Sequence, residues 1–378
     1  MPPSARPPAA MEPLATSGPS AAVPSPGPEA GLPVHGPRRR GTVLLGWDPV
    51  CQRSDSISAE TGVPLTTIHY LFYRRPWIAP LKYLLQAVAT LAWLVRRGPA
   101  LVVVTSPPPF AAVVVRAWCA LSGARYAIDA HTGIFLEPKW RPFLPLSRWL
   151  SRGAVTTIVT NDALRETVES WGARGFVLPD PLPDVPPERE RFPLDASKTN
   201  VAAVFSFYED EPVDEMLAIS NLPPDMHVWV TGDSSRVPER QRAALSPQVT
   251  LTGFLSRAAY DSLLSRCDAV VVLCTRPHTL LCGAYEAVAA HKPLVTSESD
   301  AMRHHFRRGV VWTGNSTAEI EAALREVAAR GGELAAEMRE ADREMRLDWQ
   351  RTCDRLLGEL ASGGVARSDL PVPRWRRA

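Results

Sequence analysis

The chain has 378 residues, a length that favours two domains of about 150–200 residues each. Its 42 Lys and Arg nearly balance its 40 Asp and Glu, which disfavours a nucleic-acid-binding protein with a generally basic surface. The six cysteines form no Cys-x-x-Cys pair, so we expect reduced thiols and neither a metal site nor a disulfide scaffold.

The two ends of the chain differ from the rest in composition. Of the 37 prolines, 11 fall in residues 1–40, and this segment holds almost no aromatic or β-branched residues, so it is predicted to be a disordered tail. It has no basic start followed by an apolar run, so we expect no secretory signal. Residues 362–378 end in a basic cluster and are predicted to form a second flexible tail.

No stretch reaches the roughly 18–20 uninterrupted apolar residues of a membrane-spanning helix. Leu81–Val95 comes closest, but it contains Lys82 and Gln86 and predicts a buried or interfacial helix. Ala100–Val115 is interrupted by three prolines and predicts a strand followed by a loop. We therefore expect a cytoplasmic protein, with peripheral contact to the anionic inner face of a membrane as an open alternative.

Short β-branched runs alternate with helical patterns in the first half of the chain. The predicted strands are Thr42–Leu45, Leu65–His69, Leu101–Thr105, Ala127–Asp129, Thr157–Thr160 and Phe176–Leu178. The predicted helices are Ser54–Thr61, Leu81–Arg96, Ala111–Ser122, Leu144–Gly153 and Asp162–Gly172. A proline-rich run over residues 179–187 then predicts a stiff, extended linker.

The alternation starts again after the linker. The predicted strands are Val201–Ser206, His227–Thr231, Val249–Thr252, Ala269–Leu273, Pro293–Thr296 and Val310–Trp312. The predicted helices are Asp214–Ser220, Arg257–Arg266, Gly283–Ala290, Ala301–Phe306 and Ala318–Arg330, followed by a charged helix from about Gly332 to Leu360.

This pattern predicts an α/β protein with two doubly wound parallel sheets joined by a hinge. The predicted parts are a tail (1–40), a first domain (41–180), a hinge (181–190), a second domain (191–331), a C-terminal helix packing back on the first domain (332–361) and a tail (362–378). Ligands of such sheets bind beyond the carboxyl ends of the strands, so we expect the site in a cleft between the domains.

Charge divides unevenly between the halves. Residues 41–180 hold 14 basic and 9 acidic side chains, whereas residues 191–361 hold 19 basic and 25 acidic ones. A basic first domain suits a phosphate-bearing acceptor or an anionic membrane, although a bias of this size also arises by chance.

The best-defined candidate site lies between the predicted strands Ala269–Leu273 and Pro293–Thr296. Gly283 stands where a helix would begin, so free backbone N–H groups there can hold phosphate oxygens. Glu286 lies one turn further on, where a carboxylate can accept hydrogen bonds from ribose hydroxyls. An ordinary helix-start glutamate, favoured by the helix dipole, is the alternative.

This stretch, Thr279 to Thr296 with its Gly, Glu-Ala and Lys-Pro-Leu-Val, resembles the donor site of retaining, family-four-like GT-B glycosyltransferases. Similar segments follow the family's order: Asp129-Ala130-His131-Thr132, Thr160-Asn161-Asp162, the exit Val177–Pro181, Leu251–Leu255 and Tyr260–Asp268. The resemblance spans roughly residues 42–355. It implies two Rossmann-like domains facing a cleft, with donor-binding roles for Thr279, Cys282, Gly283, Glu286, Phe254 and Leu255.

Two departures from the family concern the donor site. The family's first donor-site glutamate, eight residues before Glu286, is His278 here, which can hydrogen-bond a sugar hydroxyl instead. The loop Phe205–Pro212 is acidic and lacks the family's Arg and Lys, so Arg276 is a candidate to offset the diphosphate charge. The same loop is similar to that of chitobiosyl-diphosphodolichol mannosyltransferases, which implies a lipid-linked acceptor.

In the first half, His131 follows a predicted strand end and is a candidate to donate a hydrogen bond to the transferred sugar or phosphate. Relatives meet the acceptor through the loop after the first strand, which here contains Trp47, Asp48 and Arg53. Trp47 can stack on a sugar ring or serve as a core aromatic.

The resemblance implies a hexosyltransferase with His131 and His278 as catalytic candidates, a nucleotide-sugar donor of unspecified base, and a glycan or lipid-linked acceptor. We expect retention of stereochemistry and no further cofactor or metal, because no Asp-x-Asp motif stands at a suitable strand end. A catalytically inactive GT-B protein that binds a glycan or a partner is the first alternative, because His278 and the missing basic pair favour it. A sugar-nucleotide epimerase is another.

Overall fold

The structure, a computed structural model, describes residues 41–49, 51–70, 78–184 and 191–376. All of them belong to one compact unit, Arg39–Ala378. The predicted N-terminal tail, the part of the predicted hinge over 185–190 and the last two residues lie outside the described residues.

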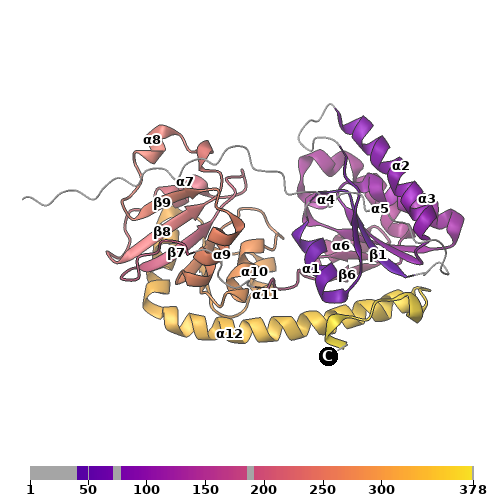
Figure 1. Cartoon of the computed structure of the whole chain (residues 1–378). Helices are drawn as coiled ribbons and strands as arrows, with labels where there is room; N and C mark the ends of the chain where they lie inside the picture. The colour runs from indigo at the N-terminus through magenta and orange to yellow at the C-terminus, as the bar shows by residue number, and fades with distance from the viewer. Residues whose placement is uncertain (1–40, 50, 71–77, 185–190, 377–378) are drawn as a thin grey trace, which may run out of the picture. The chain divides into compact units, whose positions relative to one another are not determined.

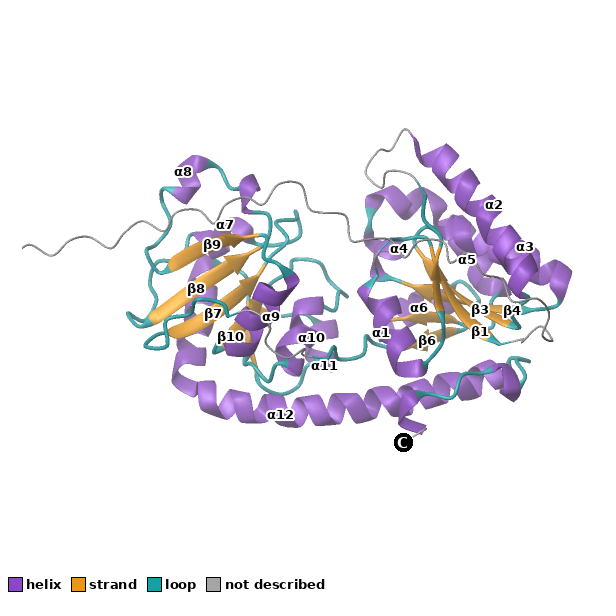
Figure 2. Ribbon diagram, in the orientation of Figure 1, coloured by secondary structure: helices purple, strands orange, loops and turns teal. Residues whose placement is uncertain are grey.

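The first sheet has six parallel strands in the order β2-β1-β3-β4-β5-β6. These are β1 Thr42–Gly46, β2 Leu65–Thr67, β3 Leu101–Ser106, β4 Arg125–Ala130, β5 Thr157–Val159 and β6 Gly175–Val177. The helices that accompany them are α1 Gln52–Thr61, α2 Ala79–Arg97, α3 Pro109–Ser122, α4 Thr132–Leu136, α5 Leu144–Gly153 and α6 Asp162–Ser170 (Figures 1 and 2).

The second sheet also has six parallel strands, in the order β12-β11-β10-β7-β8-β9. These are β7 Thr199–Val204, β8 Met226–Thr231, β9 Val249–Gly253, β10 Ala269–Val272, β11 Leu294–Ser297 and β12 Val310–Thr313. Its helices are α7 Val213–Leu217, α8 Glu239–Arg242, α9 Arg257–Arg266, α10 Cys282–Ala289, α11 Asp300–His305 and the start of α12 Thr317–Ser362. The predicted pair of doubly wound sheets is therefore confirmed, and the short α4 and α8 were not predicted.

Both sheets are buried on two faces, which explains their continuous apolar runs. In β3, Val102 and Val104 face a core under α3, whereas Leu101 and Val103 face a second core that includes α12. Side chains alternate across a strand, so a run of four apolar residues fills both layers at once. Because both faces are buried, each strand is a continuous apolar run, and such a run can be recognised in the sequence.

Two expectations near the chain ends are corrected. The predicted break near Gly332 is absent, and α12 is one helix of 46 residues that begins with a capping box of Ser316 and Glu319. Buried Leu334 and Met338 hold it past the glycines, so packing outweighs the cost of about 1 kcal/mol per glycine. Residues 363–376 are packed and do not form the flexible tail expected there, since Val365 is buried and the Asp369 carbonyl accepts a hydrogen bond from Thr42.

Strand order marks where ligands can bind. In each sheet the order reverses at one point, between β1 and β3 in the first sheet and between β7 and β10 in the second. A crevice forms beyond the carboxyl ends of the strands at such a point. The loops concerned are residues 47–51 and 107–108 in the first sheet, and residues 205–212 and 273–281 in the second.

The last third of α12 completes the core of the first sheet. Trp349 is 6% exposed and its indole N–H donates a 2.9 Å hydrogen bond to the Pro179 carbonyl. It also packs edge-on against Trp375, and Cys353, Leu356 and Leu360 join it in the same cluster. The C-terminal part of α12 therefore packs in the same hydrophobic core as the strands of the first sheet.

We predict that Trp349→Ala lowers the unfolding free energy by about 3–5 kcal/mol, because it removes a buried aromatic side chain and its hydrogen bond. Hydrogen exchange should accelerate in β3 more than in β10. Leu347→Ala, at a position that is 52% exposed on the same helix, should change stability by less than about 0.5 kcal/mol. Equal exchange in both sheets would show that α12 does not complete the first core selectively.

Candidate functional site

A buried arginine organises the strand ends of the first sheet. Arg53 in α1 is 6% exposed, and its Nε lies 3.0 and 3.1 Å from the two carboxylate oxygens of Asp129. Its Nη2 donates to Asp129 at 2.9 Å and to the Leu178 carbonyl at 2.9 Å, and its Nη1 donates to Asp180. These contacts join α1, the end of β4 and the exit from β6.

Electrostatics keep this cluster charged. Burial acts to raise the pKa of Asp129, but Arg53 and His131 outweigh it and hold that pKa far below its usual range. Burial likewise opposes the charge on Arg53, and its two carboxylate partners raise its pKa instead. Because its donors are engaged, Arg53 lies in the wall of the site, whereas the sequence suggested contact with the acceptor.

His131 is held at the end of β4, where it precedes α4. Its Nε2 lies 3.3 Å from Asp129 Oδ2 and 4.0 Å from Cys51 Sγ, and its side chain is 27% exposed. Burial acts to lower the pKa of His131, but hydrogen bonds to Asp129 and Cys51 outweigh this effect and raise the pKa to about 10. Burial raises the pKa of the Cys51 thiol, and His131 and Ser54 more than offset this, so it lies below its ordinary value. The raised pKa of His131 favours the protonated imidazole at neutral pH.

The other candidates of this loop differ in exposure. Trp47 is 1% exposed, donates a 2.9 Å hydrogen bond to Thr90 and stacks on Tyr83, so it is the core aromatic of the two alternatives. Asp48 is partly exposed, and its pKa is raised by burial, with His131 and Lys82 acting in the opposite direction.

In the second sheet, Glu286 lies on α10 and is 8% exposed. One carboxylate oxygen accepts a 2.5 Å hydrogen bond from the Tyr260 hydroxyl, and the other lies 3.8 Å from Arg257 Nη1. Burial raises the pKa of Glu286, while Tyr260, Arg257 and a hydrogen bond from Gln52 lower it in part. Gln52 belongs to α1, so this carboxylate receives a hydrogen bond from the first half of the chain.

The start of α10 lies close to the sheet. A Cβ on Gly283 would come within 2.9 Å of Val272, so glycine permits this approach. No side chain caps α10, and the same is true of α1 to α5, α7 and α8, whereas Asn161, Ser256, Ser299 and Ser316 cap α6, α9, α11 and α12. Cys282, the first residue of α10, is exposed, although desolvation by the groups around it raises its pKa to about 12. The Thr279 hydroxyl donates a 3.3 Å hydrogen bond to the Pro277 carbonyl.

In the loop after β7, backbone N–H groups are already bonded to a carboxylate of the same loop. The Glu211 carboxylate accepts hydrogen bonds from the backbone N–H of Ser206, at 2.9 and 3.0 Å, and of Tyr208, at 3.2 Å. Nearby, Arg276 Nε lies 3.2 Å from Asp210 Oδ2. The cation proposed to meet the donor diphosphate is thus paired with a carboxylate, which a ligand would have to displace or join.

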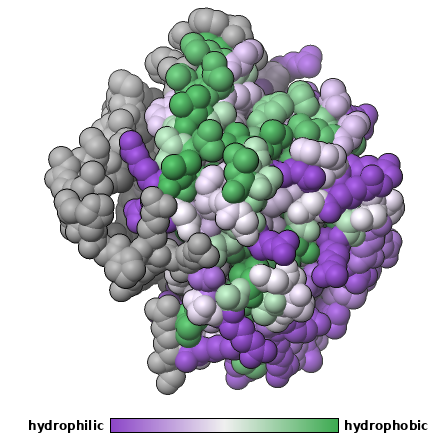
Figure 3. All heavy atoms as spheres, turned by 90° about the vertical axis from the view of Figure 1, so that its right-hand side faces the viewer, coloured by the Kyte–Doolittle hydropathy of each residue, from purple (hydrophilic) through white to green (hydrophobic). Residues whose placement is uncertain are grey.

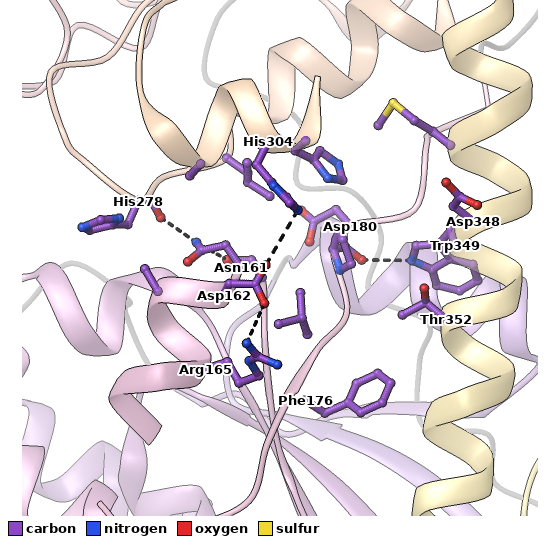
Figure 4. A pocket seen from close by; sticks show the side chains of 18 of the residues that line it. Asn161, Asp162, Arg165, Phe176, Asp180, His278, His304, Asp348, Trp349 and Thr352 are labelled. Atoms are coloured by element: carbon purple, nitrogen blue, oxygen red, sulfur yellow. Dashed lines mark hydrogen bonds and ion pairs between the residues drawn. The ribbon is translucent and has the colours of Figure 1, made fainter. Parts of the chain in front are cut away.

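A cavity of about 810 Å³ lies between α6, α11, α12 and the exit from β6 (Figure 4). Of the candidates from the sequence, only His278 lines it. Asn161 donates a 2.8 Å hydrogen bond to the His278 carbonyl, and Figure 4 shows the His278 ring turned away from Asn161. Within the part of the chain that the structure describes, no hydrogen bond or ion pair joins His278 to His131.

Phe254 and Leu255 are the remaining candidates from the sequence, and three further residues were not singled out there. Phe254 is 81% exposed after β9, whereas neighbouring Leu255 packs against a buried cluster. Sequence reasoning assigned no role to Tyr260, Arg257 or Glu211. The helix-start pattern of Ser256 and the spacing of Arg257 and Tyr260 by three place both on one face of α9, but nothing in that pattern identifies Glu286 as their partner.

Over the residues that the structure describes, no helix is long and apolar enough to cross a bilayer. Within the same residues, no group of three or more His, Cys, Asp and Glu side chains is arranged to hold a metal ion.

We predict that His131 titrates near pH 10 in the native protein, compared with 6.5 in unfolded chains. Since the folded pKa is raised, the stabilisation from its protonation is fully present below pH 6.5 and is lost as pH rises towards 10. NMR of the imidazole protons, assigned with His131→Gln, measures this directly. Cys51→Ala should lower the midpoint, and a native midpoint near 6.5 would contradict the described pairing.

Comparison with known proteins bears on the second half and on the fold. Residues 212–330 match the sequence family described as Glycosyl transferases group 1. No curated protein matches the chain. The segment contains α9, the β10–α10 loop and Glu286, so it coincides with the predicted donor site.

Solved structures extend the likeness across the described chain. HepE of Anabaena in complex with UDP and glucose has 14% identity and a TM-score of 0.64, covering 85% of this chain and 100% of its own. Sucrose-phosphate synthase of Thermosynechococcus elongatus has 13% identity and a TM-score of 0.62, covering 85% and 98%. A glycosyltransferase of Rickettsia africae has 12% identity and a TM-score of 0.64, covering 85% and 99%. The chain thus has the GT-B fold, and residues 212–330 in its second half match the family described as Glycosyl transferases group 1.

Proposed function

We propose that the protein transfers a hexosyl group from a nucleoside-diphosphate sugar to a hydroxyl of a glycan or lipid-linked acceptor. One observation carries the proposal: the uncapped start of α10, with Gly283 and Glu286, stands at the switch point of the second sheet and within the matched family segment. Backbone N–H groups at such a helix start favour phosphate oxygens.

In this proposal Glu286 accepts hydrogen bonds from the ribose, and Tyr260 and Gln52 hold its carboxylate in place. The first N–H groups of α10 receive the diphosphate. As the bond to the sugar breaks, negative charge grows on the departing diphosphate, and fixed donors directed at that charge lower the barrier.

His131 is proposed to serve the sugar side of the reaction. Its raised pKa supports a cationic imidazole, which can donate a hydrogen bond to a sugar hydroxyl or to the phosphate next to it. Asp129 orients the imidazole, and Asp129 and Cys51 together raise its pKa. Retention of stereochemistry and independence of metal are part of the proposal and rest on the likeness to the family.

The donor is tested first with UDP, because HepE was solved with UDP, with UDP and glucose, and with UDP-glucose. Calorimetric titration of UDP, GDP and ADP identifies the base. Release of labelled sugar from the matching sugar nucleotide, with and without glycan and lipid-linked acceptors, tests transfer. Adding a chelator tests the metal, and the configuration of the product tests retention.

A second candidate function is a GT-B protein that binds nucleotide or glycan without transferring sugar. Glu211 on the backbone amides of its loop, and Asp210 beside Arg276, favour it, because two carboxylates already lie near the proposed diphosphate. Tight nucleotide binding with neither hydrolysis nor transfer for any donor would support this candidate against the first.

We predict that Glu286→Gln weakens nucleoside-diphosphate binding by about 1.5–3 kcal/mol, the range for a hydrogen bond to a charged group. Titration calorimetry measures the change. Tyr260→Phe is the matched control, since it keeps the carboxylate and removes one partner, and its loss should be smaller. An unchanged affinity for nucleoside diphosphate in a folded Glu286→Gln protein would contradict the proposed contact between Glu286 and the ribose.

We predict that His131→Ala lowers turnover about 100-fold while the affinity for nucleoside diphosphate stays within about twofold, since the lost contact acts on the sugar in the transition state. His278→Glu, which restores the family's carboxylate, should keep or raise turnover. His291→Asn, at a side chain that is 44% exposed and outside the cavity lining, is the control and should be neutral. Full turnover of His131→Ala would remove His131 from the mechanism.

A further inference from the structure

Helix α2 presents its apolar side to solvent. Six large apolar side chains are exposed by 42–62% at helical spacing along this side: Leu81, Leu84, Leu85, Val88, Leu91 and Val95. Helices on the surface of soluble proteins normally turn such a stripe inward. A contiguous exposed apolar face of this kind marks an interaction surface.

The buried side of α2 carries polar groups beside Leu94, so the helix cannot bury its stripe by rotating without exposing Leu94 and moving these polar groups. Gln86 is fully buried and donates hydrogen bonds of 2.8 and 3.2 Å to the carbonyls of Ile68 and Trp47. Thr90, also fully buried, accepts the 2.9 Å hydrogen bond from the Trp47 indole. Turning the helix over would leave these polar groups without partners.

The neighbouring helices continue the surface. Leu121 at the end of α3 is 87% exposed, and Trp149 in α5 is 49% exposed with the Arg116 guanidinium 3.8 Å from its ring centre. α2 packs on α3 and α3 on α5. Figure 3 shows apolar side chains gathered in a patch on this side of the molecule. An arginine-backed tryptophan is typical of a boundary between apolar and aqueous surroundings.

Charge identifies the kind of partner. The helices α2, α3 and α5 have 19, 14 and 10 residues and contain no Asp or Glu, although the chain has 40 of them. They carry Arg96, Arg97, Arg148 and Arg152 at exposed positions, besides Arg116. Apolar side chains bordered by arginine, with acids excluded, complement a bilayer that has negatively charged headgroups.

We propose that the face formed by α2, α3 and α5 docks on an anionic lipid bilayer. α2 lies flat, with its leucines in the outer acyl region and the arginines at the headgroups. None of the residues of this face belongs to the proposed transfer site, so the proposal stands whether or not the protein transfers sugar.

The test is flotation of the full chain with vesicles of phosphatidylcholine alone or with about one third phosphatidylserine. We expect binding to the anionic vesicles, weakened but not abolished by 0.5 M salt (roughly a 4 Å screening length), because burial of leucine does not depend on salt. Leu84→Glu with Val88→Glu should lower partitioning by about tenfold or more. Arg96→Glu with Arg97→Glu should remove the preference for phosphatidylserine.

Matched controls separate a surface effect from a folding effect. Leu347→Glu changes a leucine that is 52% exposed on α12, and Arg339→Glu with Arg343→Glu makes the same charge change there; neither should alter flotation. Absence of binding to anionic vesicles, or equal binding of the α2 variants and the parent, overturns the proposal. So does a concentration-dependent dimer in size-exclusion chromatography that Leu84→Glu with Val88→Glu abolishes, because a second copy would then cover the face.

Discussion

A single buried guanidinium constrains the first half of the molecule. An isolated charge in the interior is so costly that Arg53 is stable there only with its carboxylate and carbonyl partners in place. Those partners come from the end of β4 and from the exit of β6, so α1 is fixed against both. Asp129 is shared with His131, and the geometry that neutralises Arg53 therefore also sets the position and charge of the histidine.

The second half solves a related problem with neutral groups. Glu286 is nearly buried and is held by a tyrosine hydroxyl and an amide, with one arginine further away. Its raised pKa contrasts with the lowered pKa of Asp129, because Asp129 has a guanidinium in contact and Glu286 does not. Two carboxylates beside two similar sheets thus differ in their partners: Asp129 pairs with cationic groups, and Glu286 accepts hydrogen bonds chiefly from neutral ones.

Much of the fold could be predicted because both sheets are buried on two faces, so that runs such as those in β3 and β10 stand out in the sequence. Long-range pairing could not be predicted. Arg53 and Trp47 both follow the first strand and could equally have met an acceptor, and only the distant Asp180 and Thr90 show that they are structural. The Glu211 carboxylate depends on a loop conformation that composition does not specify. The glycines of α12 mislead because tertiary packing overrides local propensity.

The course of α12 has a consequence for how the chain is made. The helix starts among side chains of the second sheet, and from Trp349 onward it fills the core of the first. During synthesis the strands of the first sheet leave the ribosome early, yet the side chains that cover one of their faces emerge only after the entire second sheet. One apolar face of the first sheet is therefore uncovered while the second sheet is synthesised. During this interval the nascent chain exposes a surface that a chaperone can bind.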